Sequence, residues 1–535
     1  MIGKILGRKS YTITGAAIVI GTASFVSKII ALARDRIFAH HFGAGDIMDS
    51  YYAAFKIPDL VFNLLIVGAL SAGFIPIFVE LINKDKKEAW KVTNAMINIL
   101  GFLLIISCTL LIIFTPQVLK LLVPGFSGEK LKLAITLSRI MFISPILLGI
   151  SSIVSGVLQS FKAFLIYSLS PIMYNIGIII GALFLVPIFG TIGLAIGVVI
   201  GALFHLLIQI PYFIQYGFKY QPTFDWKNIY VRKIAKLMIP RTLSMATKQI
   251  NFLAITIIAS TLASGSLSIF NFADNIQSVP TSIIGISFAI AIFPALSQMA
   301  SNNDNKKIIQ QISETTKQIL FLIIPITIIM FLLRAQIVRL ILGTGQFDWD
   351  ATTLTFTALG IFSFSLFAQS LTPILSRSFY ALQDTLTPLI ISVISDITSI
   401  IIAIYLSHFY GIIGLFVAYS FSQVFQFGFL WLLLRNKLGT LQESKIFISI
   451  MKIFIAAVIM ALSIQFMKYT ISLFVNMNKF WGILLQMGIS SIIGLLIYAI
   501  ICHQLKLKEM QLFQESFKKK WLKLRNVDTG INNNI

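Results

Sequence analysis

Apolar segments long enough to cross a bilayer follow one another along almost the whole of this 535-residue chain. A helix needs about 20 predominantly apolar residues to cross a hydrocarbon core about 30 Å thick. The chain is 57% hydrophobic and only 12% charged, which is more apolar surface than a soluble protein of this size could bury. The runs are far longer than the strands of a membrane barrel, and lipid cannot satisfy an open backbone. The sequence therefore predicts an all-α polytopic membrane protein.

We expect about fourteen transmembrane helices, with ends placed to within a few residues. They lie near residues 12–36, 55–82, 91–115, 133–160, 165–187, 190–216, 234–262, 268–299, 309–333, 352–380, 386–407, 411–435, 446–469 and 480–503. The first run follows basic residues but lacks a small-residue cleavage site, so we interpret it as a retained helix and not as a cleaved signal.

Basic residues gather in loops that share one side of the membrane if these helices alternate. The net charge is +22. The main clusters run from Lys4 to Lys9, Lys84 to Lys91, Lys219 to Lys236 and Arg435 to Lys445. By the positive-inside rule this side, with both termini, is cytoplasmic, and loops such as those around Asp46 and Asp348 are on the opposite side. Topology and anionic lipid explain the basic charge, so no nucleic-acid partner is expected.

The two halves of the chain match at several points with a near-constant offset of roughly 220 residues. FGAG at Phe42–Gly45 corresponds to LASG at Leu262–Gly265, and GTIGLA at Gly190–Ala195 corresponds to GIIGLF at Gly411–Phe416. An even number of spans per half makes the repeat parallel, and transporter sites commonly lie between such halves. We therefore expect two pseudo-symmetric lobes of about six helices each, with a substrate cleft between them.

This repeat sets the predicted domain boundaries. Residues 1–218 form an N-terminal lobe with the first six spans, and residues 219–440 form a C-terminal lobe with the next six. Residues 441–505 add a terminal helix pair that lies outside the repeat. Residues 506–535 form a basic cytoplasmic tail, whose first part suits an interfacial helix.

Ionisable residues in and beside the first two spans suggest a polar route, because charges at membrane depth are expensive and commonly functional. Asp49 follows a compact Gly-Ala-Gly turn between these spans, Lys28 lies well inside the first span, and Arg34 lies near its end. The alternatives are a solvated loop for Asp49, and for Lys28 an intrahelical ion pair with Asp35 or snorkelling to the boundary.

The seventh span supplies two further cations. Arg241 follows Pro240, and Lys248 lies on the same helical face. Opposite the cations of the first span they would form a positive cleft suited to phosphate, because arginine offers a planar fork and lysine a point charge. The alternative is that Arg241, close to the cytoplasmic end, only marks topology.

Polar residues also enter the eighth and eleventh spans. The eighth begins with Ser268 and Asp274 among several amides, and the eleventh carries an isolated Asp396. A buried carboxylate needs a partner, so Asp396 is a candidate site for a coupling cation or proton. A buried hydrogen bond to a serine or threonine is the alternative.

No catalytic arrangement emerges from the rest of the sequence. The five histidines are scattered, and nothing resembles a phosphate-binding loop, a metal-ligand set or a nucleophile elbow. Cys108 and Cys502 lie far apart in apolar spans and predict no disulfide. We therefore expect no enzyme activity, no cofactor and no metal, with energy coming from a gradient, the membrane potential or a partner.

At these residues the chain resembles the MurJ (MviN) lipid II flippases of the multidrug/oligosaccharidyl-lipid/polysaccharide exporter superfamily. The most specific segments are Ser27–Leu60, Pro240–Ser266 and FNFADNIQSVP at Phe270–Pro280. The resemblance implies a multi-pass protein of the bacterial plasma membrane. It would export the undecaprenyl-diphosphate-linked peptidoglycan precursor from the inner to the outer leaflet by alternating access, in cell-wall biogenesis and cell shape.

The resemblance also carries over individual residues. Lys28 and Arg34 match the family's cavity cations, Asp49 matches its acidic residue after the turn, and Ser268 and Asp274 match the serine and aspartate of its eighth helix.

This chain departs from the family pattern at several positions. Phe62, Asn63 and Val67 stand where well-studied members have two arginines and a glutamate, and Asn275 stands where they have an arginine. Arg241 and Lys248 are candidates to replace the missing charge.

Three hypotheses follow. The first is a flippase for lipid II, or for another lipid-linked oligosaccharide, whose partners are its substrate, membrane lipids and cell-wall synthesis proteins. The second is a cation-coupled multidrug antiporter of the same superfamily. The third is a membrane scaffold whose basic tail recruits cell-wall synthesis partners. The cations of the first span and the terminal helix pair favour the flippase.

Overall fold

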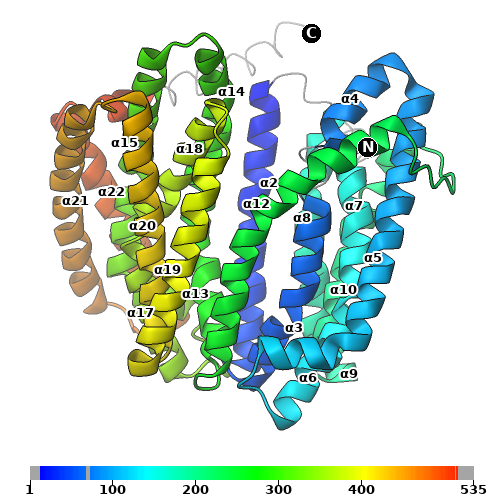
Figure 1. The fold of residues 1–535 in the computed structure, drawn as a ribbon. Helices are drawn as coiled ribbons and strands as arrows, with labels where there is room; N and C mark the ends of the chain where they lie inside the picture. Colours follow the sequence, from blue (N-terminus) through cyan, green and yellow to red (C-terminus); the bar gives the residue numbers. More distant parts are fainter. Residues whose placement is uncertain (1–12, 68–72, 513, 516–535) are drawn as a thin grey trace, which may run out of the picture. The chain divides into compact units, whose positions relative to one another are not determined.

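The computed structural model describes residues 13–67, 73–512 and 514–515. Within these ranges the chain is helical, with short turns and no strand (Figure 1). The predicted all-α membrane architecture is confirmed in this part of the chain. The basic tail predicted from residue 506 onward falls mostly outside the described residues.

The first 260 residues form α-helices and two short π-helical segments, η1 and η3, within the described part of the chain. They are α2 (Ile13–Phe42), α3 (Asp46–Phe62), η1 (Asn63–Val67), α4 (Ile75–Lys84), α5 (Lys86–Leu122), α6 (Gly128–Met141), α7 (Ile143–Ser160), α8 (Phe164–Ile180), η3 (Gly181–Leu185), α9 (Val186–Phe189), α10 (Ile192–Leu207), α11 (Ile210–Gln215) and α12 (Ile229–Ser260).

The remaining helices follow a similar pattern. They are α13 (Ser266–Pro280), η4 (Thr281–Ile286), α14 (Ser287–Ser301), α15 (Asn305–Leu332), α16 (Arg334–Ile341), α17 (Trp349–Ser363), α18 (Leu366–Ala381), α19 (Leu386–Tyr410), α20 (Ile412–Leu438), α21 (Glu443–Ser472) and α22 (Phe480–Gln504).

Each of the predicted spans contains a helix or a broken helix, but the count of fourteen is not confirmed. Ten described helices are long and apolar enough to cross a membrane, and α17 with α18 would make an eleventh across a bend of 49°. Residues 68–72 inside the second predicted span, and the side chains of 13–20 and most of 239–248 in the first and seventh, lie outside the described residues. Whether the first, second and seventh predicted spans cross the membrane is therefore not tested by helix length and composition.

Two π-helical segments occupy corresponding places in the two sequence halves. η1 follows α3 in the second predicted span, and η4 follows α13 in the eighth. The two start points are separated by roughly the 220 residues of the repeat offset. Interrupted helices in matching positions are common in transporters built from repeats, and the repeat itself stays a prediction.

Side chains at two loops explain where long helices begin. The Asp85 carboxylate accepts hydrogen bonds from the backbone amides of Lys87 and Glu88 at the start of α5. The Asn228 side chain accepts from the amides of Tyr230 and Val231 at the start of α12. Each cap satisfies amide groups that have no partner within the helix.

The chain divides into two compact units. The first contains residues 1–276, 341–355 and 392–419, and the second contains residues 277–340, 356–391 and 420–535. The predicted lobes at 1–218 and 219–440 remain a prediction, as does the separate helix pair at 441–505.

Within the first unit, glycines allow α8 and η3 to approach α10 closely. A Cβ on Gly177 would lie 2.3 Å from Cα of Gly201, and one on Gly181 would lie 2.5 Å from Cα of Gly197. Lipid provides no hydrophobic force to join helices, so spanning helices gain packing energy by such close backbone contact at small residues. α2 packs against the other side of this pair through its contacts with α8.

Within the second unit, α21 and α22 pack against each other and α21 packs against α15. Gly494 of α22 faces Ile464 of α21 closely enough that an added Cβ would clash at 2.6 Å. The Gln336 amide donates to the Gln486 side chain (2.9 Å), and the Gln486 amide donates to the Lys468 carbonyl (2.7 Å). These two bonds of buried amides join α16, α21 and α22.

Candidate functional site

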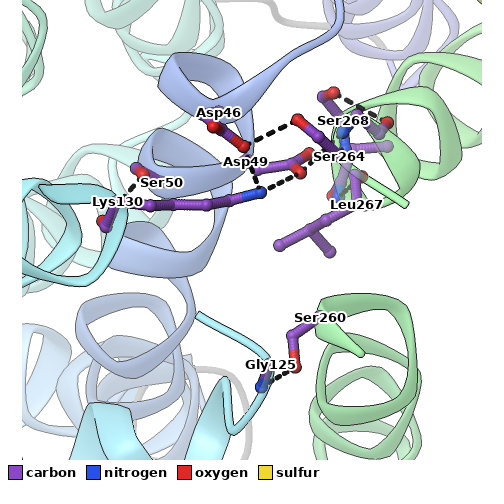
Figure 2. A network of polar contacts seen from close by, with 11 residues as sticks. Asp46, Asp49, Ser50, Gly125, Lys130, Ser260, Ser264, Leu267 and Ser268 are labelled. Atoms are coloured by element: carbon purple, nitrogen blue, oxygen red, sulfur yellow. Dashed lines mark hydrogen bonds and ion pairs between the residues drawn. The ribbon is translucent and has the colours of Figure 1, made fainter. Parts of the chain in front are cut away.

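A carboxylate from the first turn of α3 caps the start of α13. Asp49 Oδ2 accepts from the Gly265 amide (2.8 Å), and Asp49 Oδ1 accepts from the Ser268 amide (2.9 Å; Figure 2). The Asp49 side chain is only 2% exposed. A buried carboxylate at a helix N-terminus is stabilised by the free amides and the positive end of the helix dipole.

Lys130 completes this cluster from α6. Its Nζ lies 2.8 Å from Asp49 Oδ2 and 2.7 Å from Asp46 Oδ1 (Figure 2). The same Nζ lies 4.2 Å from the centre of the Phe126 ring. Asp46 also accepts from the Ser264 hydroxyl at 2.6 Å. These contacts lower the pKa of Asp46, with the hydrogen bond from Lys130 as the largest cause. We call Asp46, Asp49, Lys130, Ser264, Gly265 and Ser268 the latch.

Two glycines make the latch geometry possible. Gly43 and Gly265 have φ of +64° and +89°, a region that favours glycine. A Cβ on Gly265 would lie 2.5 Å from the Ala44 carbonyl oxygen. Gly265 therefore lets the loop before α13 approach the loop before α3, so that its amide reaches Asp49.

The latch joins segments that the repeat assigns to different lobes. Asp49 belongs to the predicted N-terminal lobe, and Ser268 belongs to the predicted C-terminal lobe. The two predicted residues therefore meet directly, but Ser268 contributes its amide while its hydroxyl donates to the Gly265 carbonyl (2.9 Å). Lys130 was not among the predicted site residues, because the sequence placed it in a loop between two predicted spans, where a lysine gives no signal for this role.

A second cluster surrounds a cavity of about 420 Å³ between α2, α8 and α13. Lys28 and Arg34, two of the predicted site residues, both line it, together with Ser27, Asn175 and Asn275. The lining of the cavity thus carries two cations and seven side chains with a hydroxyl or amide group. We call this space the cationic cavity.

Arg34 does not stand alone in the cavity. Its guanidinium contacts Asp35 Oδ1 at 2.7 Å and 3.0 Å and donates to Asn175 Oδ1 at 3.0 Å. Asp35 is almost fully buried, with 1% of its side chain exposed, whereas 17% of the Arg34 side chain is exposed. Arginine is therefore held in place by a buried carboxylate while part of it remains open to the cavity.

Asn275 completes the arrangement around Asp35. Its Nδ2 donates to Asp35 Oδ2 at 2.9 Å, so both carboxylate oxygens are bonded. The position where the resemblance leads one to expect arginine thus carries a neutral donor to the same carboxylate. Asn175 was not predicted, because nothing in the sequence distinguishes it from other amides in apolar spans.

Lys56 and Asp274 lie in the same region of the fold. The Lys56 ammonium donates to Asn271 Oδ1 (3.1 Å) and lies 5.5 Å from the centre of the Phe252 ring. Asp274, a predicted site residue, is half-buried in α13. These groups add charged side chains of both signs to the segment between the cavity and the latch.

Asp396 of α19 meets Asn251 of α12, whose side-chain amide donates to Asp396 Oδ1. The alternative prediction was a hydrogen bond from a serine or threonine. The structure shows a hydrogen bond to Asp396, but the donor is an asparagine. Ion coupling at Asp396 stays a prediction.

The remaining predicted residues cannot be placed. Arg241 and Lys248 lie in α12, but their side chains are outside the described residues. In the described part of the chain no group of three or more histidine, cysteine or acidic residues is arranged to hold a metal ion.

Sequence comparisons identify close relatives of the chain. The family model described as "Lipid II flippase MurJ" matches residues 38–513. A protein from Buchnera aphidicola (subspecies Schizaphis graminum), named "Probable lipid II flippase MurJ", is 31% identical over 508 residues, which cover 94% of this chain and 98% of the relative.

Solved structures agree with the sequence comparisons. A structure described as lipid II flippase MurJ in an inward closed conformation matches with a TM-score of 0.75 and 26% identity, over 91% of this chain and 99% of that one. An inward-facing multidrug resistance MATE transporter of the MOP superfamily matches with a TM-score of 0.66 over 80% of this chain and 99% of the other. Its identity is only 16%, so this second likeness concerns the fold alone.

Proposed function

Since this chain belongs to the lipid II flippase MurJ family, we propose that it moves lipid II, the undecaprenyl-diphosphate-linked peptidoglycan precursor, from the inner to the outer leaflet. The observation that carries this proposal for its own residues is the cationic cavity. Its two cations line a space within helices of a multi-pass membrane protein, where a charge without function would be costly.

The chemistry of the cavity suits a diphosphate linked to a sugar. Arg34 is fixed by Asp35 and Asn175, so its guanidinium needs little reordering to contact a phosphate oxygen. Lys28 adds a second positive group, and Ser27 and Asn275 add neutral polar groups for hydroxyl or amide contacts. The long apolar tail of such a substrate would stay in the bilayer, so only the headgroup must enter the cavity.

Alternating access follows from the position of the latch. In this proposal the latch closes the outer end while the cavity accepts the headgroup from the cytoplasmic side, and its opening releases the headgroup outward. The contacts of Asp49 support this role because they join the two predicted lobes through one carboxylate, which can separate from α13 as a single event. The MATE-like fold is consistent with such a rearrangement.

We further place the protein in the bacterial plasma membrane with both termini in the cytoplasm. Single cysteines next to Asp46 and Asp348 should react with an impermeant maleimide added to intact cells, and a cysteine next to Lys86 should react only after permeabilisation. Labelling next to Lys86 in intact cells would reverse the topology. The basic segment from residue 506 is our candidate for contacts with cell-wall synthesis proteins.

Transport is tested with purified protein in liposomes that contain lipid II. We expect lipid II to reach the outer leaflet faster with protein than without it, and Lys28→Gln to slow this transfer. Lys132→Gln is the matched control, because Lys132 is 74% exposed and pairs with Glu129 outside the cavity. Equal transfer by the wild type, the Lys28 variant and protein-free liposomes would refute the proposed function.

A further inference from the structure

A second, larger cavity lies in the first unit and shares no lining residue with the cationic cavity. It measures about 610 Å³, within the range of small-molecule sites. Its walls come from α5, α7, α11 and the segment after α11. They include Ile97, Gly101, Ile105, Ile150, Phe213 and Phe218. These residues are apolar, so the occupant that fits this cavity is a hydrocarbon chain.

Hydrogen bonds hold the loop that forms one wall. Asn94 of α5 donates to the Lys219 carbonyl (3.0 Å) and accepts from the Gln221 amide (2.9 Å). Asn98 donates to the carbonyls of Gln221 and Thr223, both at 3.0 Å, and accepts from the Tyr220 hydroxyl at 3.0 Å. We call residues 218–224 the strap. Buried amides tie the strap down at both ends, so the cavity is a built feature of the fold.

The cavity opens toward the lipid-facing side of its helices. Phe102 and Ile105 of α5, Ile214 of α11 and Phe224 of the strap line the cavity and are each about half exposed. Exposed apolar side chains continue along α5 to Phe114, as expected where a spanning helix contacts acyl chains. Gly101 leaves one wall open, since a Cβ there would meet nothing within 4 Å.

Cations surround the polar end of the cavity. Lys219 of the strap is exposed, and Lys86 Nζ lies 3.8 Å from the position of a Cβ on Gly217, next to the strap. Lys91 pairs with Asp225 just beyond it at 3.1 Å. Lysines at the end of an apolar groove match a negatively charged lipid headgroup, because anionic lipids attract basic side chains at the membrane surface.

We propose that this cavity binds one acyl chain of an anionic phospholipid, whose headgroup contacts Lys219 and Lys86 at the membrane surface. The lipid would be a resident ligand that supports α5, α7, α11 and the strap. The proposal does not rest on transport of lipid II, and it is tested by binding alone.

The test is native mass spectrometry of the purified full-length protein after delipidation, titrated with phosphatidylglycerol, phosphatidylcholine or undecaprenyl phosphate. We expect one phosphatidylglycerol to bind more tightly than either other lipid. Gly101→Phe fills the cavity and should weaken this binding by about tenfold or more. Lys219→Gln should reduce the preference for phosphatidylglycerol over phosphatidylcholine.

Gly428→Phe is the matched control, because Gly428 in α20 also has nothing within 4 Å of an added Cβ but lies outside the cavity. Ile150→Trp fills the cavity from α7 and serves as a second blocking variant if Gly101→Phe does not fold. Unchanged binding in a folded blocking variant overturns the proposal. Equal binding of the two phospholipids overturns the charged-headgroup assignment, and tighter binding of undecaprenyl phosphate assigns the cavity to a polyprenyl chain instead.

Discussion

The latch and the cationic cavity use the same kinds of residues in different ways. In the latch, two carboxylates surround one lysine, and Asp49 is also bonded by the amides at the start of α13. In the cavity, one buried carboxylate serves Arg34 and Asn275, while Lys28 lines the same space. Negative charge is therefore in excess in the latch, whereas the residues that line the cavity include two cations and no carboxylate.

This difference separates a contact within the protein from a site for a ligand. Helix amides and Lys130 satisfy the carboxylates of the latch, so the latch gains nothing from an added ion. The cavity has two cations in its lining at membrane depth, and an anionic headgroup could contact both of them. We therefore expect variants of the latch to change conformation and variants of the cavity to change substrate binding.

The largest effect is expected for Arg34→Ala. Loss of the guanidinium removes a phosphate contact and leaves Asp35 buried without its ion pair, which costs about 3–5 kcal/mol in known cases. Lipid II transfer in liposomes should fall to the protein-free level. Arg34→Ala with Asp35→Asn removes the stranded charge, so this double variant should regain thermal stability without regaining transfer.

Arg139→Ala is the control for a lost arginine, because Arg139 is exposed on α6 and lies outside the cavity. Normal transfer by Arg34→Ala would mean that the cavity does not bind the headgroup through this residue.

Asp49→Asn should have the next largest effect. We expect it to change the conformation of the protein by opening the latch. The change keeps the shape of the side chain but weakens hydrogen bonds to the Gly265 and Ser268 amides and removes the ion pair with Lys130. Charge-assisted hydrogen bonds contribute about 1.5–3 kcal/mol, so the latched population should fall by about tenfold to a hundredfold relative to the open one. The measurement is maleimide labelling, from the outer side, of a cysteine at Ser266, a buried residue of α13 that is not part of the latch.

Asp46→Asn is the matched comparison, since the Asp46 side chain is 62% exposed and has no bond to a helix amide. Equal labelling of the Asp46 and Asp49 variants would show that the helix cap does not hold the latch closed.

Variants of Arg241 and Lys248 test whether these two cations replace the family arginines that this chain lacks. If both cations face the headgroup, neutralising both should slow transfer by more than the product of the single effects, because neighbouring groups couple. Asn275→Arg should then partly restore transfer in the double variant, since it adds a cation at the cavity. Unchanged transfer in the double variant would assign both residues to topology.

The smallest effect concerns pH. Lys130 lowers the pKa of Asp46, so the contribution of Asp46 to the latch is fully present above the ordinary aspartate pKa of about 3.9 and is lost as the pH falls through the lower value in the folded protein. An exposed pair contributes at most about 1 kcal/mol. Labelling of the cysteine at Ser266 should therefore stay constant from neutral pH to about pH 5. A marked rise within that range would require another titrating group in the latch.

Apolar run length alone determined the all-helical membrane architecture, because lipid imposes the same length and backbone requirement on every spanning segment. The turns at Gly43 and Gly265 were also predicted from the sequence, since a loop between spans needs backbone conformations that glycine supplies. Lys28 and Arg34 were found for a related reason: an ionisable residue in an apolar run is visible without any knowledge of its neighbours.

Only the tertiary structure decided what those residues contact. Asp49 meets the amides of Gly265 and Ser268, Lys130 joins them from α6, and Asn175 reaches Arg34 from α8. Each contact joins positions far apart in the chain, and helix periodicity relates only residues three or four apart. An amide or a loop lysine has the same local signature wherever it points. Its role is therefore decided by which helices pack beside it.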